Sequence, residues 1–117
     1  MHMLGWNGYR RQISAGVVSL GKLSPDTVRG YLAMNGAGQK IGHFEDKSRE
    51  LIAVAVAISS RCDGCITVHT DAARKFGASQ GEIAEAMGVA IGVNAGAAII
   101  YATRALDSLD AAEEVAS

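Results

Sequence analysis

Three observations predict an all-α fold for this chain. Hydrophobic residues make up 49% and charged residues 20% of its 117 residues, so it can build a core and is not disordered. Alanine is abundant and proline occurs once, which suits closely packed helices better than a β-sandwich. Apolar positions recur at helical spacing between short breaks. The length allows one domain and not two.

The first predicted helix covers about residues 5–20. Its apolar side chains are three or four positions apart, at Tyr9, Ile13, Val17 and Leu20. Gly21-Lys22-Leu23 interrupts this pattern. We therefore expect residues 1–22 to form a helical arm beside the core of the domain.

A second helix is predicted to begin at Ser24-Pro25. Serine is a good N-cap, and proline is tolerated at the first helical position because the N–H there has no helical partner. The helix is expected to end near Met34, at Asn35-Gly36-Ala37-Gly38, with three side chains facing inward: Val28, Tyr31 and Leu32. A loop of about ten residues then carries His43 and Phe44 towards Asp46.

Three more helices are expected after this loop. The third begins near Lys47 or Ser48 and ends near Ser60, where its alanines favour a buried helix over a strand. The fourth covers Cys62 to Phe76 and is closed by Gly77 in a left-handed cap. Ser79 and Glu82 form a capping box that opens a fifth helix to about Leu109. We expect a frayed tail over residues 110–117, and one domain over residues 1–117 with its core at about 23–109.

Charge and composition exclude several partners. Eleven Lys and Arg against twelve Asp and Glu give a net charge of −1, so no basic face is expected for nucleic acid or an anionic membrane. Aromatic residues are only 5% of the chain, too few for stacking on bases. The start of the chain lacks a positively charged region followed by an apolar stretch, so we expect no secretory signal and a cytoplasmic protein.

The segment from Ala86 to Thr103 is unusually apolar, with Asn94 as its only other clearly polar side chain. It is near the lower length limit of a membrane-spanning helix, but it is rich in alanine and glycine, so we favour a buried helix without a membrane. Glycines recur at every fourth position, at Gly88, Gly92 and Gly96. A monomer of this size cannot easily cover such a helix on all sides, so we expect a homo-oligomer with this helix at the interface and Asn94 fixing its register.

The chemistry is expected at Cys62-Asp63-Gly64-Cys65 and His69. The two cysteines and the histidine share one face of the predicted helix, because they are three and four positions apart. A helix N-terminus favours thiolate over thiol, and a histidine one turn away can accept the thiol proton. Two cysteines at this spacing can also close a disulfide, so that one attacks an oxidant and the other resolves the product.

Glu50 lies in the first turn of the third helix, twelve positions before Cys62. Its carboxylate either faces solvent and interacts with the helix dipole, or turns inward and orients the imidazole of His69. The alternative for the whole set is structural: two small hydrophobic cysteines and a histidine bonded to a backbone carbonyl. We favour the functional interpretation because all three side chains share one face.

The spacing Glu50-x11-Cys62-x2-Cys65-x3-His69 resembles the pattern of the alkyl hydroperoxidase D-like group of the carboxymuconolactone decarboxylase family. The flanking sequences Lys47-Ser48-Arg49 and Gly77-Ala78-Ser79 are also similar to that family, and the resemblance extends over about residues 23–109. It implies an all-α fold that assembles as trimers or hexamers.

The resemblance also implies an antioxidant peroxidase-type oxidoreductase. Cys65 would attack a small hydroperoxide, Cys62 would resolve the sulfenic acid as a disulfide, and His69 with Glu50 would form the proton relay. A dithiol protein or a lipoyl-type carrier would reduce the disulfide. No bound metal and no organic prosthetic group are expected. Gly64 differs from the best-known members, which carry a second histidine there.

Several other functions fit parts of the pattern. Cys62, Cys65 and His69, with His43 as a fourth ligand, suggest a zinc site, although the ligand set is incomplete. The decarboxylase activity that names the resembled family would require cationic groups over a substrate carboxylate. A thioredoxin-like protein would place the cysteine pair after a strand. A non-catalytic protein would use the disulfide only as a redox-sensing lock.

Overall fold

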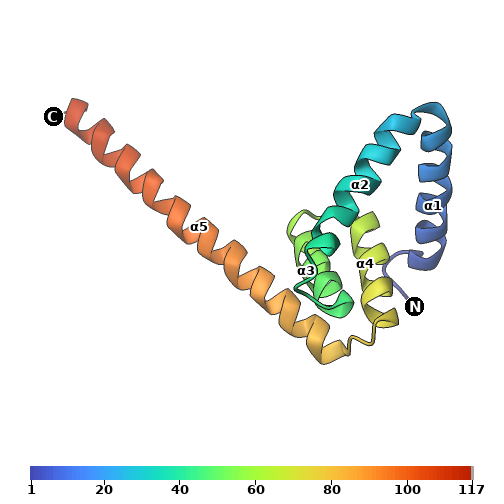
Figure 1. The fold of residues 1–117 in the computed structure, drawn as a ribbon. Coiled ribbons are helices and arrows are strands. Elements are labelled where there is room, and N and C mark those ends of the chain that lie inside the picture. The colour runs from blue at the N-terminus through green and yellow to red at the C-terminus, as the bar shows by residue number, and fades with distance from the viewer. Residues whose placement is uncertain (117) are drawn as a thin grey trace.

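The computed structural model describes residues 1–116, and every regular element in that part of the chain is a helix. The elements, shown in Figure 1, are α1 (Trp6–Leu23), α2 (Pro25–Ile41), α3 (Asp46–Ser59), α4 (Asp63–Lys75) and α5 (Gln80–Ala116). The predicted all-α class is therefore confirmed.

The centre of the molecule is the pair of helices α3 and α4. The first part of α5 packs against α3, while α1 packs against both α2 and α4. As a result, α4 lies between α3 on one side and α1 on the other (Figure 1). The fully covered apolar side chains lie where α3, α4 and α5 meet: Val54, Ala57, Ala73 and Ala90.

Local sequence signals determine how α4 and α5 begin and end. Gly77 has a φ of 88°, so it supplies the predicted left-handed cap after α4. The predicted capping box is present: the backbone N–H of Glu82 donates to the Ser79 hydroxyl at 3.1 Å. In return, the Glu82 carboxylate accepts from the backbone N–H of Ser79 at 3.0 Å.

The predicted end of α2 near Met34 is wrong. The helix continues through Asn35-Gly36-Ala37-Gly38 to Ile41 and ends at Gly42, whose φ of 80° makes the left-handed cap. A glycine inside a helix costs about 1 kcal/mol relative to alanine, which is too little to end a helix whose backbone bonds are otherwise kept. The expected ten-residue loop is therefore only residues 42–45.

Two of the three side chains expected to face inward from α2 are not buried. Tyr31 and Leu32 are 57% and 55% exposed, whereas Val28 is half-buried. Val28 packs over Gly21 of α1, where a Cβ atom would lie 3.7 Å from its Cγ2. The hairpin is therefore closed by a small contact near its turn, and much of the apolar surface of α2 has no cover within the chain.

The expected frayed tail is also wrong for residues 110–116, because α5 continues to Ala116; Ser117 lies outside the described residues. The chain is not compact, as its radius of gyration of 19.7 Å exceeds the roughly 13 Å of a compact domain of this length. In α5 only Ala90 is buried, so a single chain does not cover the apolar segment 86–103.

Candidate active site

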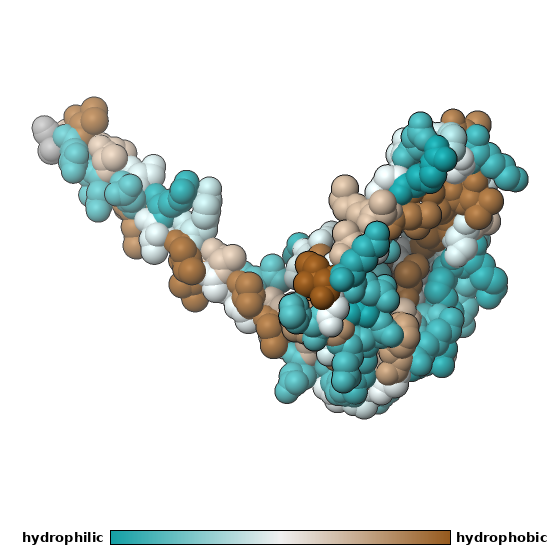
Figure 2. Space-filling model, in the orientation of Figure 1, coloured by the Kyte–Doolittle hydropathy of each residue, from teal (hydrophilic) through white to brown (hydrophobic). Residues whose placement is uncertain are grey.

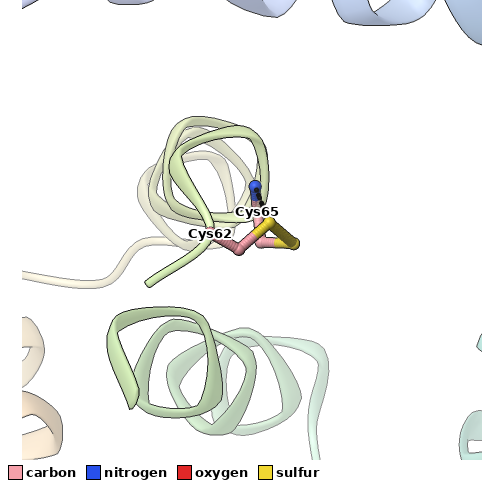
Figure 3. Close-up of a disulfide and its surroundings, with 2 residues drawn as sticks. All are labelled: Cys62 and Cys65. Carbon is pink, nitrogen blue, oxygen red and sulfur yellow. Dashed lines mark hydrogen bonds between the residues drawn. A yellow bond between two sulfur atoms is a disulfide. The ribbon is translucent and has the colours of Figure 1, made fainter. Parts of the chain in front are cut away.

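The two cysteines lie at the N-terminus of α4. Cys62 is the N-cap residue, and its Sγ accepts a hydrogen bond from the backbone N–H of Cys65 at 3.2 Å (Figure 3). The two sulfurs are joined in a disulfide, with the Cα atoms 5.2 Å apart. In the reduced protein the same N–H and the positive end of the helix dipole favour a thiolate at Cys62.

Glu50 and His69 form a pair beside the cysteines. The Oε2 atom of Glu50, on α3, lies 2.7 Å from Nδ1 of His69, on α4. Their side chains are 22% and 25% exposed, so both are partly withdrawn from water. A fully solvent-exposed Glu50 is thereby excluded. Because the carboxylate occupies Nδ1, Nε2 is the ring nitrogen left to exchange a proton with another group.

A cavity of about 380 Å³ joins the cysteines and the histidine. Helix α4 contributes Cys62, Cys65 and His69 to its wall. The facing wall comes from the α1–α2 hairpin through Tyr9, Ile13 and Tyr31. This volume is in the range of small-molecule sites, and the facing wall is apolar apart from two phenol groups.

Gly64 allows α1 to approach the turn between the cysteines. A Cβ atom on Gly64 would lie only 3.0 Å from Cδ1 of Ile13, closer than such atoms normally approach. A bulkier residue, such as the histidine of the resembled group, would need the Ile13 side chain to give way. The absence of a side chain at Gly64 therefore makes room for Ile13 of α1.

A buried threonine anchors α1 to α4. Thr67 is 2% exposed, and its hydroxyl donates to the backbone carbonyl of Trp6 at 3.2 Å. The guanidinium of Arg10 donates to the same hydroxyl at 3.1 Å, and its Nε lies 3.7 Å from Asp71. The arm expected to lie beside the core thus covers a buried polar group and one side of the cavity.

Asp71 is the acidic centre of this anchor. The pKa of its carboxyl is lowered, first by a hydrogen bond from Arg74, then by one from Lys75, and further by the charge of Arg10. Asp71 therefore stays ionised and holds positive side chains on both α1 and α4.

All four predicted site residues are near one another in the structure. Cys62, Cys65 and His69 line one cavity, and Glu50 contacts His69 from behind. His43, the fourth ligand of the zinc alternative, lines a different cavity with Phe44 and does not join them. Sequence reasoning missed the opposite wall: Tyr9 and Ile13 were placed on an apolar stripe, but periodicity does not reveal what such a stripe contacts.

The chain is similar to several curated proteins. It is 40% identical over 103 residues to an uncharacterized protein of Haemophilus influenzae, covering 88% of this chain and 91% of that protein. It is 40% identical over 80 residues to the uncharacterized protein 4 in the cox locus of Paracoccus denitrificans, covering 68% and 72%. These relatives carry no functional description.

Solved structures show the same fold. A carboxymuconolactone decarboxylase family protein from Legionella pneumophila, in its apo form, matches with a TM-score of 0.72 and 29% identity, over 87% of this chain and 91% of that chain. A protein from Methanobacterium thermoautotrophicum matches with a TM-score of 0.65 and 30% identity, over 70% and 92%. The sequence model of the carboxymuconolactone decarboxylase family matches residues 25–108. The chain is therefore an alkyl hydroperoxidase D-like member of the carboxymuconolactone decarboxylase family, with a cysteine pair compatible with a redox role.

Proposed function

We propose that this protein is a thiol peroxidase that reduces small organic hydroperoxides through Cys62 and Cys65. The observation that carries the proposal is the 2.7 Å contact between Glu50 and His69, beside a cavity that also contains both cysteines. A purely structural disulfide needs no carboxylate–imidazole pair next to it. Activation of a thiol does, since the thiolate is the nucleophile and a base must take its proton.

In the first step Cys65 is the nucleophile. It lies one helical turn before His69, which accepts the thiol proton while Glu50 stabilises the imidazolium. The thiolate attacks one oxygen of the hydroperoxide and the O–O bond breaks. The sulfur is oxidised to a sulfenic acid, and the alkoxide takes the proton from the site and leaves as an alcohol.

In the second step Cys62 resolves the sulfenic acid. Its thiolate, favoured by the Cys65 N–H, attacks the oxidised sulfur, and the hydroxyl group leaves as water after protonation. The product is the Cys62–Cys65 disulfide. A dithiol then reduces it by exchange and becomes a disulfide itself, so one hydroperoxide and one dithiol yield an alcohol, water and a disulfide.

The lining of the cavity argues against a decarboxylase. Among the described residues, no arginine or lysine lines it. Arg49 is paired with Asp46, and Arg74 with Asp71. A substrate carboxylate in this cavity would therefore lack the cationic partner that it needs.

We also propose that the protein works in the cytoplasm as a homo-oligomer, a trimer or a hexamer. The support is the bare surface of α5, where a Cβ atom built on Gly88, Gly92 or Gly96 would find no atom within 4 Å. Apolar side chains follow the same helix as it leaves the body of the molecule (Figure 2). Another copy of the chain would cover this surface.

The peroxidase is tested with reduced protein, tert-butyl hydroperoxide and dithiothreitol. Cys65→Ser should abolish turnover, and Cys62→Ser should greatly reduce it, because dithiothreitol must then reduce the Cys65 sulfenic acid directly. His69→Gln should slow thiol oxidation at pH 7 by about a hundredfold, with recovery at higher pH as thiolate forms unaided. Glu50→Gln should slow it by about tenfold, since the pair loses its charge.

His43→Gln and Glu85→Gln are the matched controls, because they make the same changes at residues outside the cavity. Equal rates for His69→Gln and His43→Gln at pH 7 would contradict the proposed relay. A disulfide that forms once and is never cycled by a dithiol would instead support a redox-sensing lock.

A further inference from the structure

We infer that Tyr9 is a further catalytic residue of the cysteine site, one that donates a proton to the leaving group. The inference rests on the proposed redox function and adds a residue outside the segment that matches the family, residues 25–108. The phenol oxygen of Tyr9 lies 4.0 Å from the position of a Cβ atom on Gly64, between the two cysteines. Its side chain lines the cavity with both cysteines and His69.

The position of Tyr9 is well determined by the packing of α1. Ile13 lies one turn further along the same helix and packs against Gly64. Arg10, next to Tyr9, reaches the buried Thr67 and Asp71 on α4. The helix is therefore held to α4 by polar contacts beside Tyr9 and by an apolar contact one turn away, which limits the movement of the phenol over the cysteine turn.

The phenol O–H of Tyr9 can protonate the departing oxygen while His69 holds the proton taken from Cys65. The phenol of a tyrosine carries an O–H group that can donate to an oxygen bearing negative charge. When the Cys65 thiolate cleaves the O–O bond, negative charge develops on the departing oxygen. Tyr9 donates to that oxygen, and an alkoxide is a stronger base than a phenolate, so the proton moves to it.

The proton balance closes through His69. The imidazole takes the proton of Cys65, the phenol gives its own proton to the alkoxide, and the imidazolium then reprotonates the phenolate. The net change is one proton moved from the thiol to the alcohol. During disulfide reduction the same phenol donates to the sulfur that leaves as thiolate.

The test compares Tyr9→Phe with Tyr31→Phe. Both remove one phenol oxygen from the same cavity wall, but Tyr31 comes from α2 and is 57% exposed, against 41% for Tyr9. Tyr9→Phe should slow both thiol oxidation by tert-butyl hydroperoxide and disulfide reduction by dithiothreitol about tenfold at pH 7. Tyr31→Phe should slow both reactions less than Tyr9→Phe does, and Tyr101→Phe, which removes a phenol oxygen on α5 outside the cavity, should match the wild type.

A second variant tests the position of the phenol. Gly64→Ala adds a Cβ atom 3.0 Å from Cδ1 of Ile13, so the Ile13 side chain must give way, and we expect Tyr9, one turn away on the same wall, to shift with it. It should slow both reactions, and adding Tyr9→Phe to it should slow them little further, because the two changes remove one interaction. The fluorescence of Trp6, at the start of α1, should change in Gly64→Ala and stay as in the wild type in Tyr9→Phe.

The outcomes separate this inference from the proposed function. Wild-type rates for Tyr9→Phe in both reactions, with Cys65→Ser still inactive, would overturn the role of Tyr9 alone. Equal slowing by Tyr9→Phe and Tyr31→Phe would also overturn it. A wild-type protein that consumes no hydroperoxide would overturn the peroxidase. Slower disulfide reduction in Tyr9→Phe than in Tyr31→Phe would still support the phenol as donor.

Discussion

Arg61 is the residue that turns the chain from α3 into the cysteine helix. Its φ of 52° is in the left-handed region, where a side chain costs about 1–2 kcal/mol and glycine is the usual residue. The turn brings the N–H of Cys62 to the carbonyl of Ala57 at 3.1 Å, which leaves Cys62 as the N-cap of α4. The backbone of Arg61 therefore helps to position the cysteine pair.

Replacing Arg61 by glycine should stabilise the oxidised protein by about 1 kcal/mol, because the strain is relieved. Urea denaturation measures the change. Arg61→Ala is the control: it removes the same side chain but keeps a Cβ atom, so it should give no comparable gain. Equal stabilisation by both variants would show that the side chain, and not the backbone, carries the effect.

At the scale of elements, the docking of α1 on α4 depends on one buried hydroxyl. Thr67 donates to the Trp6 carbonyl and accepts from Arg10, so it satisfies two groups of α1 at once. This contact positions the wall of the cavity that carries Tyr9 and Ile13. The stability of α1 and the geometry of the site are therefore linked.

Thr67→Val keeps the shape of the side chain but leaves both groups of α1 without this partner. We expect α1 to lose about 1 kcal/mol of docking free energy, so its amide hydrogens should exchange about fivefold faster. Thr103→Val, at an exposed threonine of α5, is the matched control. Unchanged exchange in α1 would mean that Arg10 and Asp71 suffice to hold it.

The starts of α3 and α5 are joined by an ion pair. Nζ of Lys47 lies 2.8 Å from Oε2 of Glu82. The hydrogen bond from Lys47 lowers the pKa of Glu82 below its ordinary 4.5, with a further contribution from the backbone of Ser79. The hydrogen bond from Glu82 raises the pKa of Lys47 above 10.5.

The sign of the pH dependence follows from these shifts. A lowered folded-state pKa means that Glu82 stabilises the fold fully above pH 4.5 and that this contribution is lost as the pH falls through the folded value. The difference in unfolding free energy between wild type and Glu82→Gln should therefore be constant from pH 6 to 8 and shrink towards pH 3. Thermal unfolding across this range measures it, and a constant difference would contradict the assignment.

At the scale of the whole molecule, α5 is the element that most needs a partner. It is about 55 Å long at the usual rise per residue, yet it packs only through its first part on α3. Its most apolar 18-residue window has a mean hydropathy of 1.7, and 6% of that window is buried. By length and composition alone α5 could cross a membrane, but one such helix is weak evidence for a membrane protein. Within residues 1–116, four apolar residues are buried, which is too few to stabilise a single chain.

Ile99 offers a direct test, since it is 73% exposed in the single chain and shares a helix face with Gly92 and Leu106. Ile99→Asp should convert the assembled wild type into smaller species by sedimentation, because it places a charge in the interface. Ser108→Asp adds the same charge half a turn round the helix and should leave the assembly intact. A wild type that is monomeric in buffer, or soluble only with detergent, would contradict the proposed oligomer.

The signals that predicted the elements act within one or two helical turns. The capping box of Ser79 and Glu82, the left-handed Gly77 and the shared face of Cys62, Cys65 and His69 all depend on neighbouring backbone, which is why the sequence predicted them. The end of α2 is not predicted correctly, because a glycine inside a helix costs only about 1 kcal/mol relative to alanine, so Gly36 and Gly38 do not end the helix.

By itself, therefore, the sequence determined the helical class and the face on which the two sulfurs and the imidazole lie. Only the tertiary structure decided that the Glu50 carboxylate turns onto His69 and that Tyr9 and Ile13 close the cavity over Gly64. It also decided that α5 leaves the body of the chain with its apolar face uncovered. The physical reason is that periodicity identifies which side of a helix is apolar, whereas the choice of what covers that side depends on the packing of helices distant in sequence.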